Sequence, residues 1–351
     1  MQNRDLLIQT QTPYHVIISQ NDFFDFVCYL DYPLSTRFVL VSDDKVAPLY
    51  LDDLKGALKT AGYTVLEWIM PHGEENKSQD TYFALLDFLA KETITRSDAL
   101  IALGGGVVGD LTGFVAATYL RGIDFIGIPT TLLSMVDSSV GGKTGINLSR
   151  GKNLCGAFKQ PKLVYCLVPT LESLEELYFQ EGLAEVVKYA FIGEKWLYAL
   201  LKDETITKDS PNLVSLIEHA IAMKAKIVQE DEFETGKRKL LNFGHTFAHG
   251  IEKASGYTYR HGKAVAIGMK LIMVGAWQKG LVSKSVVDDL DWILKQQGLD
   301  FSWIEGQEKI VYYALSDKKR MGDKITLVLA NEDGGFLHDI EVAKLGEFLP
   351  S

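Results

Sequence analysis

Three histidines and one glutamate have the residue types and the spacing of a metal site. His245 and His249 are four residues apart, so a helix through this segment places both imidazoles on one face. His261 follows after a turn that contains glycine and tyrosine, which allows it to return to the same place. Two imidazoles and one carboxylate, here Glu185, make a catalytic zinc site when one coordination position stays open. The sequence therefore predicts metal-assisted chemistry.

The carboxylate stands in the segment Gly182–Ile192, where Glu185 and Lys188 are the only charged residues. A helix that is apolar all round is buried, and a buried charge is costly unless it is paired or bound to a metal. A mutual Glu185–Lys188 ion pair is the alternative to a metal ligand, and the histidines alone could be satisfied core residues. The segment His245–His249 lacks the glutamate of the H-E-x-x-H motif, which disfavours peptide hydrolysis.

A glycine-rich turn forms a second candidate site. The glycines of Gly104–Gly109 have the G-x-G-x-x-G spacing, between an apolar strand at 99–103 and a helix expected at 111–120. Such glycines let the backbone approach a pyrophosphate at a helix N-terminus, although a plain strand-to-helix turn has the same spacing. Because Asp110 follows and the motif lies far from the N-terminus, we expect the glycines to approach the diphosphate and Asp110 to face the nicotinamide end.

The segment Pro129–Thr144 combines hydroxyls, the carboxylate of Asp137, paired glycines and Lys143. Its end resembles a P-loop, but Asp137 occupies the position of the first glycine, which excludes an ATPase of that kind. Lys152 and Asn153 then add an amine and an amide suited to phosphate or carboxylate. Polar surface loops often carry the same residues, so the composition of this segment alone does not distinguish an anion-binding site from an ordinary surface loop.

The charged segment Asp231–Arg238 precedes the histidines and, taken alone, is typical of a solvated loop. Its continuity with the histidine segment leads us to expect Glu234, Arg238 and Asn242 in the same cleft. The chain has a net charge of −10, which argues against nucleic acid as a partner. Local cations in an acidic chain fit a small polyanionic substrate. Those near the motifs are Arg121, Lys143, Lys152, Lys188, Lys224 and Arg238.

These residues must be positioned by two kinds of structure. The strands expected in the first half span 37–42, 63–70, 99–103, 125–128 and 163–168, and the helices 48–62 and 81–92. This alternation predicts an α/β layer with parallel strands. The later helices are expected at 174–191, 212–230, 244–254, 263–279 and 286–297, and late strands at 324–330 and 336–342. We predict an α/β domain at 1–168 and a mostly helical domain at 169–351.

The bulk properties are those of an ordinary globular protein. A chain of 351 residues, 47% of them hydrophobic, is long enough for two domains. Cys28, Cys155 and Cys166 have no paired or metal-ligand spacing and are expected to be reduced thiols. No secretory signal and no apolar run long enough for a bilayer are visible. We expect a soluble protein of the cytoplasm without a membrane partner.

Together the motifs closely resemble the 3-dehydroquinate synthases, members of the sugar-phosphate cyclases, from about Asp43 to Val328. Each motif is modest alone, but their order along the chain is highly specific. The matching segments are Gly104–Asp110, Tyr119–Gly122, Pro129–Leu133, Val136–Asn147, Gly151–Asn153, Ala184–Lys188, Leu241–His245 and His261–Gly262.

The resemblance implies an N-terminal Rossmann-like α/β domain that binds NAD and a C-terminal helical domain that binds metal, with the active site between them. The resemblance implies that Glu185, His245 and His261 bind Zn²⁺, or Co²⁺ in its place. It implies that His249 contacts the substrate, although spacing alone pairs His249 with His245 as a metal ligand. The implied NAD contacts are Asp43, Asp44, Lys45, Glu74, Lys77, Gly105, Gly106, Val107, Asp110, Thr130, Thr131, Thr170, Leu171, Glu172 and Ser173. The implied substrate contacts are Asp137, Lys143, Lys152, Asn153, Lys188, Lys224, Arg238, Asn242, His249 and Lys318, with Arg121 contributed by the second subunit of a homodimer.

The implied substrate is 3-deoxy-D-arabino-heptulosonate 7-phosphate, and the implied products are 3-dehydroquinate and phosphate, in the shikimate pathway. Transient oxidation by NAD, elimination of phosphate, re-reduction and an intramolecular aldol closure make the net reaction that of a carbon–oxygen lyase. Such chemistry needs a site shielded from water.

Two alternatives have the same architecture. Other sugar-phosphate cyclases usually differ in the segment Asp137–Thr144, which is intact here, and metal-dependent glycerol or alcohol dehydrogenases lack the lysine and arginine clamp. A binding protein without catalysis would have no reason to keep both the metal ligands and the anion-binding residues. Lys45 stands where the family commonly has asparagine, which is expected to affect NAD affinity and not the chemistry.

Overall fold

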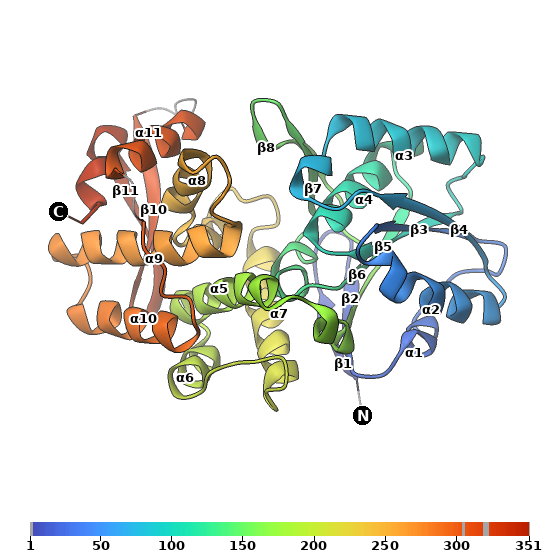
Figure 1. Ribbon diagram of the computed structural model, residues 1–351, viewed down its shortest axis with the longest axis horizontal. Helices are drawn as coiled ribbons and strands as arrows, with labels where there is room; N and C mark the ends of the chain where they lie inside the picture. Colours follow the sequence, from blue (N-terminus) through green and yellow to red (C-terminus); the bar gives the residue numbers. More distant parts are fainter. Residues whose placement is uncertain (1–2, 304–305, 319–322, 351) are drawn as a thin grey trace. The chain divides into compact units, whose positions relative to one another are not determined.

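A computed structural model of the chain describes residues 3–303, 306–318 and 323–350, without the side chains of residues 307 and 316–318. The chain forms two compact units, Met1–Leu174 and Glu175–Ser351 (Figure 1). The division lies six residues beyond the predicted boundary at 168. Most of these residues belong to the 3-10 helix η4 (Val168–Ser173), where the Thr170 carbonyl and the Ser173 hydroxyl contact the Tyr50 hydroxyl at 3.1 and 2.5 Å. Side-chain contacts with a helix of the first unit therefore keep η4 in that unit.

A seven-stranded sheet forms the centre of the first unit, in the order β1-β2-β9-β6-β5-β3-β4. All neighbours pair in parallel except β1 and β2. The strands are β1 (Arg4–Ile8), β2 (Tyr14–Ser19), β3 (Arg37–Asp43), β4 (Thr64–Met70), β5 (Ala99–Gly104), β6 (Asp124–Pro129) and β9 (Leu163–Leu167). The five predicted strands are confirmed. The sequence analysis missed β1 and β2. The strand β1 is a short edge strand that is largely exposed and shows no alternation, whereas β2 is mostly buried.

Helices cover both faces of this sheet. Alternate residues of β3 point to opposite faces, so Leu40 packs in one hydrophobic cluster and Val41 in the other. The helices α1 (Phe23–Val27) and α2 (Ala47–Thr60) cover the first face, and α3 (Gln79–Lys91) and α4 (Gly106–Thr118) cover the second. Burial on both faces explains why the central strands are continuous apolar runs.

The order of the strands reverses between β3 and β5. From β3 the chain passes through α2 to β4 on one side, and it returns to place β5 on the other side of β3. The connections that follow β3 and β5 therefore lead to opposite faces of the sheet, which is the arrangement at which open α/β sheets bind ligands.

A polar hairpin was not predicted. Residues expected in loops form the antiparallel strands β7 (Lys143–Leu148) and β8 (Gly151–Phe158). The hairpin packs against α4. No residue of β8 is fully buried, and its apolar residues Leu154 and Phe158 are exposed, so a pattern of buried apolar residues could not reveal this strand.

The second unit is mostly helical, and all five predicted helices are confirmed. Its elements are α5 (Glu176–Ile192), α6 (Lys195–Asp203), α7 (Leu213–Glu230), α8 (His245–Ala254), α9 (His261–Gln278), α10 (Lys284–Gln296), α11 (Gln307–Lys318) and the hairpin of β10 (Lys324–Asn331) and β11 (Gly334–Glu341). The sequence analysis missed α6 and α11. Among the described helices, none combines the length and the apolar character needed to cross a bilayer.

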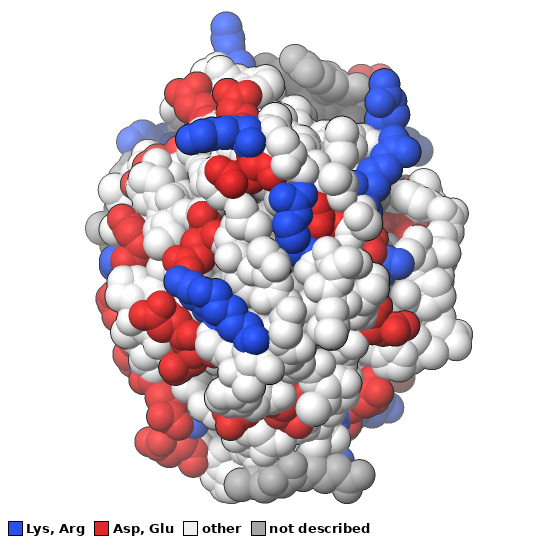
Figure 2. Space-filling view, turned by 90° about the vertical axis from the view of Figure 1, so that its right-hand side faces the viewer, with Lys and Arg blue, Asp and Glu red and all other residues white. Residues whose placement is uncertain are grey.

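The charged residues are mixed on the surface. On the face shown in Figure 2, basic and acidic side chains are interspersed. A chain with 36 basic and 46 acidic residues that forms many surface ion pairs leads to such a mixture.

Candidate active site

Three helices of the second unit bring the predicted metal ligands together. Glu185 of α5, His245 of α8 and His261 of α9 each offer one ligand atom, and these atoms lie within 4.8 Å of one another. The Glu185 Oε1 atom is 3.5 Å from His245 Nε2 and 3.2 Å from His261 Nε2. His249 lies edge-on to the His245 ring, with the centroids 5.7 Å apart. The geometry thus favours the pair implied by the family over the pair His245 and His249 expected from spacing.

A close contact between two glycines sets the position of these histidines. Gly244, with φ at +77°, directly precedes His245, and a Cβ atom on Gly268 of α9 would lie 2.2 Å from the Gly244 carbonyl oxygen. Only glycine lets the start of α8 approach α9 so closely at this point. The contact therefore places His245 next to the helix that begins at His261.

The other ring nitrogen of each histidine also has a polar neighbour. His245 Nδ1 is 3.0 Å from the Phe243 carbonyl oxygen, which leaves Nε2 with the lone pair on the Glu185 side. His261 Nδ1 is 3.8 Å from Glu252 Oε1. Such outer contacts orient histidines that bind metals. The sequence analysis missed Glu252, which lies one helical turn after His249 and is buried in α8.

The two histidines differ in their electrostatic environment. Burial, reinforced by the nearby Lys188 and His261, lowers the pKa of His245 to about 3, so its ring is neutral and available as a ligand. Burial would also lower the pKa of His261, but the carboxylates of Glu185 and Glu252 raise it to about 10. The surroundings of His261 thus favour a positive charge, which a divalent cation supplies as well as a proton does.

The ion pair considered as an alternative to a metal ligand is also present. Lys188 contacts the Glu185 carboxylate, and both side chains are almost completely buried. The Lys188 amine also lies over the Tyr189 ring, 4.7 Å from its centroid. Glu185 therefore meets a lysine and two histidines at once, so pairing with Lys188 and binding of a metal are compatible.

The remaining predicted residues of the second unit occupy several elements. Arg238 is buried. The segment before it is organised around Asp231. Burial would raise the pKa of Asp231, but hydrogen bonds from the backbone N–H groups of Arg238, Gly236 and Thr235 lower this pKa to about 2. The interpretation of this segment as a solvated loop is therefore wrong for Arg238. The Asn242 amide donates to Glu234 Oε1 at 2.8 Å. Lys224 is buried in α7, whereas the side chain of Lys318, at the end of α11, lies outside the described residues.

The glycine-rich turn joins β5 to α4 in the first unit. A Cβ atom on Gly105 would lie 3.2 Å from the Thr131 side chain, and one on Gly106 would lie 3.0 Å from the Ser138 hydroxyl. Gly105 caps α4, and Val107 lies in the first turn of that helix. The Gly104 carbonyl accepts the Thr130 N–H at 3.0 Å. Glycine at both positions thus lets the Thr131 and Ser138 side chains approach the start of α4, and no side chain caps this helix N-terminus among the described residues, which suits a diphosphate.

Asp110 of α4 forms an ion pair with a buried lysine. Lys77 Nζ is 2.8 Å from Asp110 Oδ2 and 3.6 Å from Glu74 Oε1. Burial would lower the pKa of Lys77, but the two carboxylates raise it above its usual value. Asp110 therefore contacts Lys77. That Asp110 also faces the nicotinamide end of NAD stays a prediction.

The carboxylates at the end of β3 are hydrogen bonded. Asp43 Oδ1 accepts the Lys45 and Val46 N–H groups at 3.0 and 2.9 Å. Asp44 Oδ1 lies 2.7 Å from His72 Nδ1 and accepts the His72 N–H, and these contacts lower the pKa of Asp44. His72, at the end of β4, is a neighbour that the sequence analysis missed. The NAD contacts implied in η4 are Thr170, Leu171, Glu172 and Ser173, of which Thr170 and Leu171 are buried.

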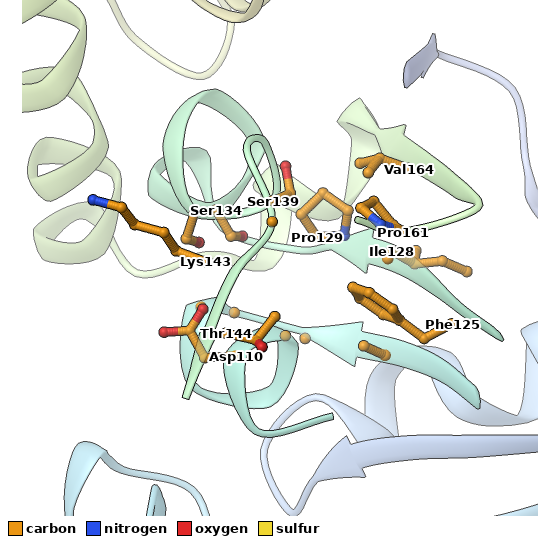
Figure 3. Close-up of a pocket in the computed structure, with 18 of the residues that line it drawn as sticks. Asp110, Phe125, Ile128, Pro129, Ser134, Ser139, Lys143, Thr144, Pro161 and Val164 are labelled. Carbon is orange, nitrogen blue, oxygen red and sulfur yellow. The ribbon is translucent and has the colours of Figure 1, made fainter. Parts of the chain in front are cut away.

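A pocket of the first unit collects residues from several of these motifs (Figure 3). Asp110 and Lys143 lie at one end of it, and Phe125 and Val164 lie at the other. Gly105 and Gly106 also line it. Asp137 belongs to the short π-helix η3 (Ser134–Ser138), whose Ser134 and Ser138 line the same pocket.

Besides Asp137, three predicted substrate contacts of the first unit lie outside this pocket lining. Lys152 and Asn153 belong to β8, and Arg121 ends the 3-10 helix η2 (Tyr119–Arg121). Asn153, Leu120 and Arg121 have positive φ values of 55°, 50° and 68°. Left-handed backbone at residues other than glycine is strained and concentrates at functional sites.

Both units match known families. Residues 67–181 match the family "3-dehydroquinate synthase N-terminal", and residues 182–320 match "3-dehydroquinate synthase C-terminal". The chain is 42% identical to a 3-dehydroquinate synthase of Streptococcus gordonii over 318 residues, which cover 89% of this chain and 90% of that protein. A 3-dehydroquinate synthase of Streptococcus pneumoniae is 41% identical over the same share of both chains.

Solved structures share the fold. A 2-deoxy-scyllo-inosose synthase, crystallised with carbaglucose-6-phosphate, NAD⁺ and Co²⁺, matches 99% of both chains with a TM-score of 0.89 at 23% identity. A 2-epi-5-epi-valiolone synthase from Streptomyces hygroscopicus with NAD⁺ and Zn²⁺ matches 95% of this chain and 94% of that one, with a TM-score of 0.85 at 26% identity. An iron-containing alcohol dehydrogenase matches 90% of this chain and 92% of that one, with a TM-score of 0.61 at 16% identity. By its matched segments and its identity to these relatives, the chain belongs to the 3-dehydroquinate synthase family.

Proposed function

We propose that this chain converts 3-deoxy-D-arabino-heptulosonate 7-phosphate to 3-dehydroquinate and phosphate, a step of aromatic amino acid biosynthesis. The observation that carries the proposal is the cluster of Glu185, His245 and His261 in a member of this family. We also infer that it acts in the cytoplasm, where the three unbridged cysteines would stay reduced.

The donor sets fit the two cofactors of this reaction. Two imidazole nitrogens and one carboxylate suit Zn²⁺ or Co²⁺. The glycine-rich turn before α4 suits the diphosphate of NAD. When bound, NAD supplies a hydride acceptor that is restored within the cycle, and the metal supplies a Lewis acid. Two solved structures of the same fold hold NAD⁺ with Co²⁺ or with Zn²⁺, which supports the pair of cofactors.

The charged residues of the chain would bind and orient the substrate. Lys143, Lys152 and Arg238 offer the charges that a phosphate and a carboxylate need in an otherwise acidic protein. The remaining residues proposed to contact the substrate are Asp137, Asn153, Lys188, Lys224, Asn242, His249 and Lys318.

Another sugar-phosphate cyclase activity is the second candidate, because the fold matches two such enzymes with TM-scores of 0.89 and 0.85. Their identity of 23–26% is far below the 41–42% of the relatives named 3-dehydroquinate synthase. The dehydrogenase matched with a TM-score of 0.61 is more distant.

The test follows phosphate and NADH in one cuvette, with 3-deoxy-D-arabino-heptulosonate 7-phosphate, zinc and a catalytic amount of NAD. We expect one phosphate per substrate and no lasting NADH absorbance, because the same cofactor returns the hydride. NADH that accumulates without phosphate would indicate a dehydrogenase. Neither signal, with bound metal verified, would exclude the proposed substrate and favour another cyclase.

We further propose a homodimer in which Arg121 serves the site of the partner subunit. Arg121 follows Leu120 in a tight left-handed turn, and the Leu120 carbonyl accepts two hydrogen bonds from Arg96 at 2.9 and 2.7 Å. This turn therefore presents Arg121 on a rigid support. Exposed apolar side chains in the same unit support burial against a second copy: Leu120, Leu148, Leu154 and Phe158.

Mixed dimers test this arrangement. Arg121→Ala and Lys152→Ala homodimers are each expected to be inactive, because every site lacks one cation. After unfolding and joint refolding, about a quarter of the sites should be active, since half of the dimers are mixed and each holds one intact site. Activity that stays at the level of the separate variants would show that Arg121 acts within its own subunit or not at all.

A further inference from the structure

Asn147 connects two parts of the first unit that are far apart in the chain. Its amide nitrogen donates to Glu74 Oε1 at 2.7 Å and to the Glu74 carbonyl at 3.2 Å. Its amide oxygen accepts the Asn153 N–H at 2.9 Å, and its own N–H donates to the Lys77 carbonyl at 2.8 Å. One side chain therefore links the segment Glu74–Lys77 to strand β8.

The link exists because the β7–β8 ladder is interrupted at this residue. Ile146 pairs with Cys155 and Leu148 pairs with Gly151, so Asn147 alone stands opposite residues 152–154. The extra residues of β8 cannot use the ladder, and the Asn147 side chain takes the place of a ladder partner for Asn153. This bond also holds Asn153 at its positive φ of 55°. Irregular pairs of this kind re-aim side chains next to active sites.

The contacts continue from Glu74 to the glycine-rich turn. Lys77, which is buried, contacts both Glu74 and Asp110 through its amine. Asp110 lies in the first half of α4. An unbroken series of polar contacts thus runs from α4 through Lys77, Glu74 and Asn147 to Asn153.

We propose that Asn147 is a positioning residue that couples the cofactor-binding segment Glu74–Lys77 to the substrate-binding residues Lys152 and Asn153. Binding of NAD orders Glu74 and Lys77, and Asn147 transmits this order to the hairpin. The inference rests on the proposed roles of these residues in NAD and substrate binding. It assigns to Asn147 no contact with either ligand.

The experiment measures amide hydrogen exchange of residues 143–158 with and without NAD, together with the dissociation constant for NAD. NAD should slow exchange in the hairpin of the unsubstituted protein about tenfold, the size of one hydrogen bond. In Asn147→Ala, NAD should still bind, but the hairpin should exchange rapidly in both states. KM for the sugar phosphate should rise about tenfold with a smaller change in kcat.

Two further variants separate the ends of the link. Asn147→Asp keeps the acceptor for Asn153 but faces Glu74 with a second carboxylate, so it should keep basal protection and lose the response to NAD. Glu74→Gln/Asn147→Asp restores a donor and an acceptor with reversed polarity. Measured at saturating NAD, because Glu74 is itself a proposed NAD contact, this variant should regain the response. Asn76→Ala is the matched control, because its amide donates to the nearby His72 carbonyl, at 2.7 Å. This variant should behave as the unsubstituted protein.

The outcomes distinguish this inference from the proposed function. If the unsubstituted protein does not bind NAD, the proposed cofactor is wrong. If NAD binds and protects the hairpin equally in Asn147→Ala, or protects it in neither protein, Asn147 does not couple the two segments and the inference is wrong.

Discussion

Replacement of His245 by alanine is expected to remove tight zinc binding and to lower kcat/KM about 10³-fold, since metal assistance is worth several kcal/mol. His245 is buried, is neutral at physiological pH and directs Nε2 toward Glu185. Without it, one carboxylate and one imidazole remain, too few for a stable site. Metal content after dialysis, measured by atomic absorption, and the visible spectrum of the Co²⁺ form check this result independently of turnover.

The comparison with two other histidine variants makes this test sharp. His261→Ala should lose zinc to the same extent, because His261 belongs to the same cluster. His249→Ala should keep one zinc per chain and raise KM, because it is proposed to contact the substrate. Loss of zinc from His249→Ala, with zinc retained in His261→Ala, would restore the ligand pair expected from spacing and reject the cluster.

Replacement of Lys188 by methionine should destabilise the metal-free protein by about 3–5 kcal/mol, the cost of leaving one partner of a buried pair without the other. Lys188 and Glu185 are 2% and 0% exposed, so solvent screens their interaction little. Zinc should recover most of the loss, because the cation then faces the Glu185 charge. Apparent melting temperatures with a chelator and with zinc measure both effects.

A double substitution controls for lost packing. Glu185→Gln/Lys188→Met removes both charges and should be more stable without metal than Lys188→Met alone, although it cannot bind zinc tightly. If zinc left the deficit of Lys188→Met unchanged, the Glu185–Lys188 pair would be a purely structural ion pair. That result would also remove the electrostatic argument for Glu185 as a ligand.

The regular elements were largely predictable because their signals are local. The strand at 99–103 and the helix at 212–230 follow from apolar periodicity within the segment itself. The hairpin of β7 and β8 escaped prediction, because its residues are polar and glycine-rich and its pairing is interrupted at Asn147. The first unit ends at Leu174 and not at the predicted residue 168 for a similar reason, because Tyr50 of the distant helix α2 holds η4 by hydrogen bonds.

By itself the sequence determined the kinds of groups available and their order: a glycine turn after a buried strand, scattered cations, and Glu185 with three histidines. Spacing alone could not tell which histidine joins the carboxylate; the family resemblance implied His261, and only the tertiary structure gives the physical reason. His249 is nearer along the chain, but the approach of α8 to α9 at Gly244 and Gly268 brings His261 to His245 and Glu185. Glu252, His72 and Asn147 acquired their positions in the same way. Spacing describes one helix at a time, whereas a site is made by the contacts of several elements, and those contacts depend on packing between residues distant in sequence.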